Sequence, residues 1–224
     1  MGRTSTEWLW SAHTFSFASY FDPAWMHFGP LRVLNQDVIA PGRGFGAHPH
    51  DNMEIVTWVL SGQLRHEDSM GNGAVLRAGD LQVMSAGSGL VHAEFNASND
   101  EPCHLLQMWV LPRGKDREPW YRDRSVACDA RTGRLLQVVG PDEDAETIDQ
   151  DARFFVSRLL PGHEVEHEVG EGRGAWLHVA TGSVEVAGTR LDAGDALGTR
   201  GAGSIVIRGS EEAEVVLWDL AGVR

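Results

Sequence analysis

The 224-residue sequence predicts an all-β chain that folds as two antiparallel β-barrels in tandem. Twenty-six glycines, against nine prolines, separate short runs rich in Val, Leu, Ile, Thr and Trp, which is typical of all-β chains, and helical periodicity is scarce. The length alone allows one large domain or two small ones. A sequence repeat indicates two domains, because LRAGD at residues 76–80 recurs as LDAGD at residues 191–195.

Each half of the chain is expected to supply six strands. In both halves an apolar strand is followed by a glycine turn, at Gly62 and Gly182, then by a second strand and the Ala-Gly-Asp turn. The same order of elements therefore occurs twice. The strands predicted in the first half are residues 31–39, 53–60, 63–66, 80–85, 91–95 and 105–111, and those in the second half are 135–139, 154–159, 175–180, 183–186, 204–208 and 214–220.

Between the two copies, residues 112–134 alternate basic and acidic side chains and show no strand pattern. We interpret this stretch as a solvated linker. The predicted domains are residues 1–125 and residues 126–224.

The charge balance and the cysteine count exclude several classes of function. Nineteen basic and thirty-two acidic residues give a net charge of −13, which disfavours direct binding of nucleic acid. Cys103 and Cys128 are too few for a secreted disulfide framework and suit a reducing cytosol. The first ten residues do not form a signal peptide, and no segment approaches the ~20 apolar residues of a spanning helix, so we expect a cytoplasmic protein without a membrane partner.

Two short motifs contain the candidate metal ligands. His48 and His50 stand at i and i+2, and His92 and Glu94 repeat this spacing, so on strands each pair points to one side. If the two strands are neighbours and face inward, four donors converge with open positions left for water or substrate. Three imidazoles and one carboxylate suit Fe(II), Mn, Co, Ni, Cu or Zn, and the donors alone do not rank these metals.

Other residues near the motifs allow alternative interpretations. Glu54, four residues after His50, is a second candidate for the carboxylate ligand. Phe45, Met53 and Trp109 are interpreted as core packing in preference to the lining of an aromatic pocket. A structural or surface role is expected for the isolated histidines His13, His27, His66, His163, His167 and His178.

The spacing around the two motifs resembles that of the cupin family. Cupins carry a glycine, a His-x-His with a later Glu and Gly, and then a glycine block that ends in a metal-binding His and an Asn. Ser85 stands where cupins commonly have proline, and the first block is one residue longer than usual. The matching positions are Gly42, His48, His50, Glu54 and Gly62 in the first block and Gly79, Gly87, His92 and Asn96 in the second.

A narrower resemblance, to pirin proteins, extends almost without a gap over residues 10–112. It rests on HTFSF at 13–17, FGPLRVLN at 28–35, FGAHPHDNME at 45–54, HEDS at 66–69 and the run 85–94. The second half is similar to the shorter bacterial pirins in layout and length. This resemblance implies a bicupin whose metal ligands are His48, His50, His92 and Glu94, with Glu54 in a supporting role.

The pirin resemblance also implies an activity, quercetin 2,3-dioxygenase, in which O₂ opens a flavonol ring and carbon monoxide is released. Glu94 would then be both a ligand and the catalytic base. Fe(II) is the metal expected first, with Mn, Co, Ni, Cu or Zn as alternatives. The C-terminal cupin is expected to lack a metal, because Gly170 and Ile207 stand where the first copy has His50 and His92.

Two other functions stay open at this point. One is a non-enzymatic, metal-bearing regulatory or redox-sensing protein, as pirins in animals are described, which leaves a protein partner possible. The other is a cupin oxygenase or isomerase that acts on a different small metabolite, since a fold hosts many chemistries.

Overall fold

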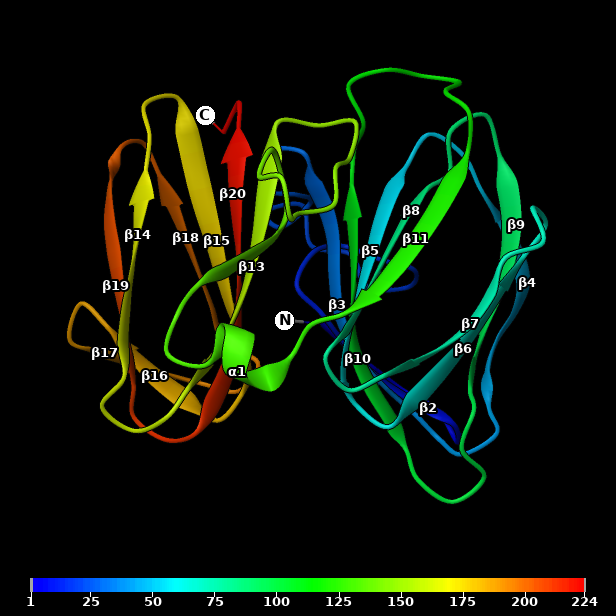
Figure 1. Cartoon of the computed structure of the whole chain (residues 1–224), viewed down its shortest axis with the longest axis horizontal. Helices are drawn as coiled ribbons and strands as arrows, with labels where there is room; N and C mark the ends of the chain where they lie inside the picture. Colours follow the sequence, from blue (N-terminus) through cyan, green and yellow to red (C-terminus); the bar gives the residue numbers. More distant parts are fainter. Residues whose placement is uncertain (1, 224) are drawn as a thin grey trace. The chain divides into compact units, whose positions relative to one another are not determined.

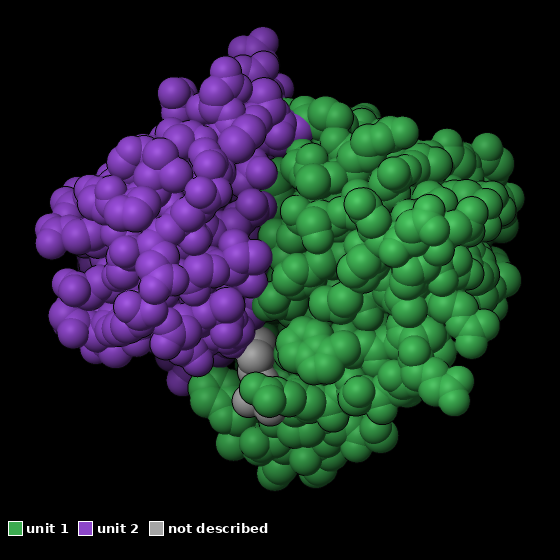
Figure 2. Space-filling view, turned by 90° about the horizontal axis from the view of Figure 1, so that it is seen from below, with its two compact units in different colours: residues 1–27, 31–125 green, residues 28–30, 126–224 purple. Residues whose placement is uncertain are grey.

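The computed structural model describes residues 2–223, which are almost entirely β-structure (Figure 1). Two compact units are present, and Figure 2 colours them separately: residues 1–27 with 31–125, and residues 28–30 with 126–224. Every strand pairing is antiparallel, and the one helix among the described residues is the single turn α1 (Cys128–Arg131). The all-β prediction is confirmed. Within residues 2–223 no helix has the length and apolarity needed to cross a membrane.

The first unit is built from two sheets. Apolar residues from both sheets share two clusters, one around Leu64 and Leu105 and the other around Ile55 and Leu90, so the sheets pack face to face. The seven-stranded sheet has the order β1 (Gly2–Ser5), β2 (Leu9–His13), β3 (Leu31–Ile39), β10 (Cys103–Val110), β5 (Glu54–Ser61), β8 (Asp80–Ser85) and β11 (Trp120–Ser125), and the four-stranded sheet has the order β4 (Gly44–His50), β9 (Leu90–Asn96), β6 (Gln63–Asp68) and β7 (Gly73–Arg77).

The second unit repeats this plan with a five-stranded and a four-stranded sheet. Its interior is aliphatic, and Ile205 and Ile207 lie buried in this core. The strand register places Ile205 at the position of His92 and Ile207 at that of Glu94. The five-stranded sheet has the order β12 (Leu136–Val139), β13 (Ala152–Leu159), β20 (Ala213–Ala221), β15 (Arg173–Thr181) and β18 (Ala196–Arg200), and the other has the order β14 (Glu164–Val169), β19 (Gly203–Gly209), β16 (Ser183–Val186) and β17 (Thr189–Asp192).

The repeated glycine turns have the same physical basis in both units. Gly62 and Gly182 have φ values of 77° and 69°, a region that favours glycine. A Cβ at Gly62 would collide with the carbonyl oxygen of Pro102, and one at Gly182 with that of Glu212. The two turns are therefore equivalent in conformation and in close packing.

The predicted linker is wrong in part, because it contains the strand β11. This strand pairs with β8 over its whole length, from Trp120 opposite Ser85 to Ser125 opposite Asp80. Its charged residues hid the strand pattern, since β11 lies at the edge of its sheet and Arg122 and Asp123 are exposed. Charged side chains are common on edge strands, where they discourage further pairing.

A polar row crosses the inner face of the seven-stranded sheet. Positions directly opposite each other in neighbouring antiparallel strands place their side chains on the same face. The register aligns one such row over five strands, and its members are His13 on β2, Asn35 on β3, Gln107 on β10, Thr57 on β5 and Gln82 on β8. This row positions the site described next.

Candidate metal centre

Three histidines on the paired strands β4 and β9 meet at one point. His48 lies directly opposite His92 in the register, and His50 follows two residues later on the same face as His48. The ring centroids are 4.4 Å apart for His48 and His92 and 4.8 Å apart for the other two pairs. A register shift between Phe45 and His48 locally bends β4 just before the motif.

The three imidazoles have ring nitrogens available to bind a cation. The Nδ1 atom of His48 lies 2.8 Å from the carbonyl oxygen of Gly46, to which it donates, so its Nε2 lone pair is free for a metal. Both ring nitrogens of His92 are buried and without a hydrogen-bond partner among the described residues. Burial lowers the pKa of His50 and of His92 to about 4, so both are neutral at pH 7. These unsatisfied nitrogen donors fit a divalent transition metal.

Glu94 reaches the cluster from β9, next to His92. Its Oε2 accepts a hydrogen bond of 2.8 Å from Gln107, and its Oε1 accepts one of 3.3 Å from Gln82. Thr57 fixes both amides, since it donates to Gln107 Oε1 at 3.1 Å and accepts from Gln82 at 3.3 Å. Burial by itself raises the pKa of Glu94, but the imidazoles of His66 and His92 and the Gln82 amide outweigh it, so the pKa is lowered. The carboxylate is therefore ionised at neutral pH.

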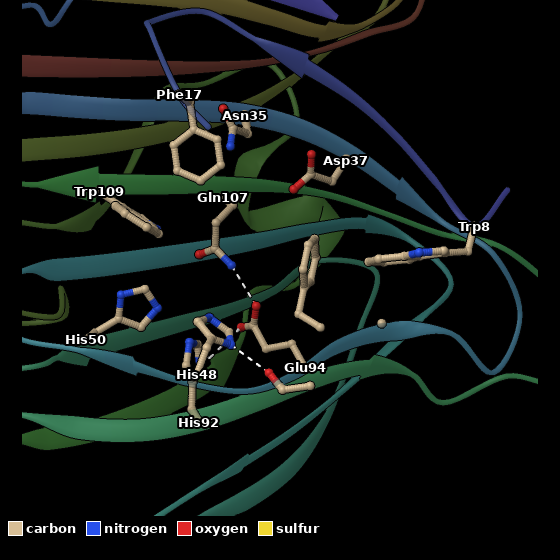
Figure 3. A pocket seen from close by; sticks show the side chains of 13 residues that line it. Trp8, Phe17, Asn35, Asp37, His48, His50, His92, Glu94, Gln107 and Trp109 are labelled. Carbon is tan, nitrogen blue, oxygen red and sulfur yellow. Dashed lines mark hydrogen bonds and ion pairs between the residues drawn. The ribbon is translucent and has the colours of Figure 1, made fainter. Parts of the chain in front are cut away.

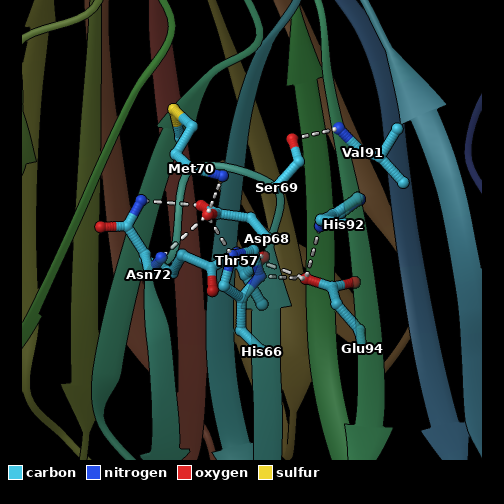
Figure 4. Close-up of polar contacts among 10 residues, drawn as sticks. Thr57, His66, Asp68, Ser69, Met70, Asn72, Val91, His92 and Glu94 are labelled. Atoms are coloured by element: carbon cyan, nitrogen blue, oxygen red, sulfur yellow. Dashed lines mark hydrogen bonds and ion pairs between the residues drawn. The ribbon is translucent and has the colours of Figure 1, made fainter.

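His66 also belongs to this site, although it was expected to have only a structural or surface role. It lies opposite Glu94 in the β6–β9 register (Figure 4). Its side chain is fully buried and stacks on Tyr121 with ring centroids 4.6 Å apart. Glu94 Oε1 lies 4.0 Å from the Nδ1 atoms of both His66 and His92. Two donor groups thus share His92: one contains His48 and His50, and the other contains His66 and Glu94.

The alternative carboxylate, Glu54, lies elsewhere. It is buried on β5 and accepts a hydrogen bond of 2.8 Å from Ser85. Thr57 faces the interior, three residues further along the strand, so alternation places Glu54 on the opposite face. Glu54 is therefore oriented away from the histidines.

The histidine cluster opens into a pocket of about 440 Å³ (Figure 3). Aromatic edges dominate the pocket: Trp109 lies 4.9 Å from His50 and 5.3 Å from Phe17 between ring centroids, and Phe45 lies 5.2 Å from Trp8. The interpretation of Phe45 and Trp109 as core packing alone is wrong, because their rings also line this cavity. The thirteen lining residues are Trp8, Phe17, Asn35, Asp37, Gly44, Phe45, Gly46, His48, His50, His92, Glu94, Gln107 and Trp109.

Comparison with known proteins identifies the family. The family model named Pirin matches residues 1–110, and the model named quercetinase C-terminal cupin domain matches residues 137–220. Quercetin 2,3-dioxygenase of Escherichia coli K12 is 41% identical over 224 residues, which cover 99% of this chain and 96% of the relative. The chain is a pirin. Both the pirin resemblance and the two-cupin fold predicted from the sequence are thereby confirmed.

Two further comparisons support the family and the fold. The pirin-like protein of Caulobacter vibrioides is 41% identical, with coverage of 99% of this chain and 96% of the relative. The crystal structure of the bacterial pirin YhhW from Escherichia coli in complex with nickel(II) superposes with a TM-score of 0.92 at 39% identity, covering 99% of this chain and 96% of that one. That bacterial pirin is thus a nickel(II)-binding protein in its crystal structure.

Proposed function

We propose that this pirin is a metal-dependent dioxygenase that opens a flavonol ring with O₂ and releases carbon monoxide. The observation that carries the proposal is the position of the three imidazoles at the wall of an aromatic-lined pocket. Flat aromatic rings suit such a pocket, and a substrate inside it lies within reach of the metal donors. The name of the Escherichia coli relative supports the choice of a flavonol.

The residues proposed to hold the metal are His48, His50, His92 and Glu94. When bound, a divalent metal supplies a Lewis-acidic position that lowers the pKa of a hydroxyl group and a centre at which O₂ chemistry is accessible. Fe(II) is the metal we propose first. The nickel complex of the related pirin makes nickel the principal alternative.

The protein's own contribution is to place groups and to exclude water. Gln82 and Gln107 hold the Glu94 carboxylate in its ionised form, so Glu94 is available to accept the proton of a substrate hydroxyl. Phe45 and Trp109 provide faces and edges against which an aromatic ring stacks. A ring that stacks against these side chains is shielded from bulk water on that side.

The test of this function is an assay of quercetin turnover with the metal-loaded protein. We expect loss of the flavonol absorbance, with one O₂ consumed and one carbon monoxide released per flavonol. The variant His92→Ala should be inactive. The matched control Glu54→Gln changes a buried carboxylate that faces away from the cluster and should retain most of the activity. Stoichiometric metal without turnover would contradict the dioxygenase and favour another substrate or a regulatory role.

A further inference from the structure

A second polar wall lines the pocket from the strand β3. Asn35 and Asp37 stand at i and i+2 on β3, so both side chains face the cavity, and both lie across it from the histidines (Figure 3). Neither residue belongs to the two donor groups of the metal centre. Their presence is unexpected, because a buried carboxyl group in an aromatic pocket is unfavourable unless it has a partner.

A chain of hydrogen bonds determines which end of the Asn35 amide faces the cavity. Thr4 Oγ1 lies 2.9 Å from His13 Nε2, and His13 Nδ1 lies 2.9 Å from Asn35 Oδ1. With Thr4 donating to Nε2, the His13 Nδ1–H donates to the Asn35 carbonyl oxygen. The Asn35 NH₂ group is therefore left as a donor, and Figure 3 shows its nitrogen on the cavity side.

Asp37 offers one of its two carboxyl oxygens to the cavity. Ser11 donates a short hydrogen bond to Asp37 Oδ1, and this is the one hydrogen bond that the described residues give to the Asp37 carboxyl group. The position opposite Asp37 on β10 is the apolar Leu105, which offers no side-chain donor. Asp37 is only 4% exposed but lines the pocket, so its second oxygen is available to a ligand or to water there.

The charge state of Asp37 indicates what kind of ligand fits. Burial, opposed by the Ser11 hydrogen bond and reinforced by the charge of Glu94, raises the pKa of Asp37 to about 7. At neutral pH the carboxyl group therefore carries a proton for much of the time and both donates and accepts hydrogen bonds. A neutral hydroxyl group suits it better than a cation does.

We propose that Asp37 and Asn35 form a subsite that binds a hydroxyl group on the part of the substrate remote from the metal. This inference rests on the proposed dioxygenase function and narrows its substrate class. The substrate is an aromatic compound with at least two oxygen functions, one at the metal centre and one held between the Asp37 carboxyl group and the Asn35 amide. The aromatic rings of Phe45 and Trp109 hold the apolar body of the molecule between the two ends.

The experiment compares two flavonols that differ in the remote hydroxyl groups. Quercetin carries hydroxyl groups on both outer rings, whereas 3-hydroxyflavone carries only the one expected at the metal. Dissociation constants are measured by calorimetry with the metal-loaded protein under anaerobic conditions, so that no turnover occurs. We expect Asp37→Leu to weaken quercetin binding about 10-fold or more, the usual effect of losing a buried hydrogen bond, and to change 3-hydroxyflavone binding less than about threefold.

Two further variants complete the comparison. Asp37→Asn keeps the shape and offers an NH₂ donor to the substrate hydroxyl group, so it should retain most of the preference for quercetin. Asp100→Leu removes an exposed carboxylate in a loop that does not line the pocket and should leave both affinities unchanged.

An equal change for the two flavonols in Asp37→Leu, or no change for either, would overturn the subsite. This outcome is separate from failure of the proposed function. If neither flavonol is turned over but Asp37→Leu still selectively weakens quercetin, the subsite stands and the dioxygenase assignment falls.

Discussion

Replacement of Asp37 by asparagine is expected to remove a pH-dependent loss of stability. The pKa of Asp37 rises from the ordinary 3.8 to about 7 in the folded protein, so the folded state binds this proton more tightly than the unfolded state does. Below pH 3.8 both states are protonated and the group contributes no pH dependence. As the pH rises from 3.8 to 7, the free energy of unfolding falls by about 1.4 kcal/mol per pH unit. Above pH 7 the loss is complete, at about 4 kcal/mol in total.

Asparagine has no proton to lose, yet its carbonyl oxygen still accepts the hydrogen bond from Ser11. The free energy of unfolding of Asp37→Asn, relative to that of the wild type, should therefore increase by about 2 to 3 kcal/mol from pH 5 to pH 8. Urea unfolding of both proteins at pH 5 and at pH 8, with a chelator present throughout, measures this change in relative stability. A difference near zero, or a loss of relative stability for the variant at the higher pH, would refute the reasoning about the buried carboxyl group.

Three further predictions concern the metal centre. Glu94→Ala should reduce the metal content of the purified protein more than Glu54→Ala does, because Glu54 faces away from the histidines; elemental analysis decides between them, and the reverse order contradicts the assignment. Gln107→Leu removes the donor 2.8 Å from Glu94 and should weaken metal binding about 10-fold in a chelator competition, whereas an unchanged affinity would mean that this amide does not position the carboxylate. Removal of the metal with a chelator should lower the melting temperature of the wild type, since only the folded chain assembles the donors, and should leave His92→Ala unchanged.

The histidine cluster could be predicted from the sequence because its geometry is local. Two donors at i and i+2 share a face on any strand, so the pairs were recognisable even in β4, whose glycines and proline give it little strand propensity. The step from two pairs to one site needed only that β4 and β9 be neighbours, and the register places His48 opposite His92.

The supporting residues could not be found in this way, because their positions depend on pairing between distant strands. His66 reaches Glu94 only through the β6–β9 register, and nothing in the sequence around His66 indicates that partner. Asn35, Gln36 and Asp37 are three consecutive polar residues in a strand, so the sequence pattern does not indicate which of them face the interior. The sheet turns Asn35 and Asp37 toward an internal pocket, where Gln107 continues the same polar row.

The central claim is that His48, His50, His92 and Glu94 together hold one metal ion. The measurement that tests it most directly is the metal stoichiometry of the full chain, purified without chelators and without a metal-affinity column, in the wild type and in His92→Ala. The structure leads us to expect close to one divalent transition metal per wild-type chain and close to none in the variant. A wild type without metal, or a variant that retains a full equivalent, would contradict the claim.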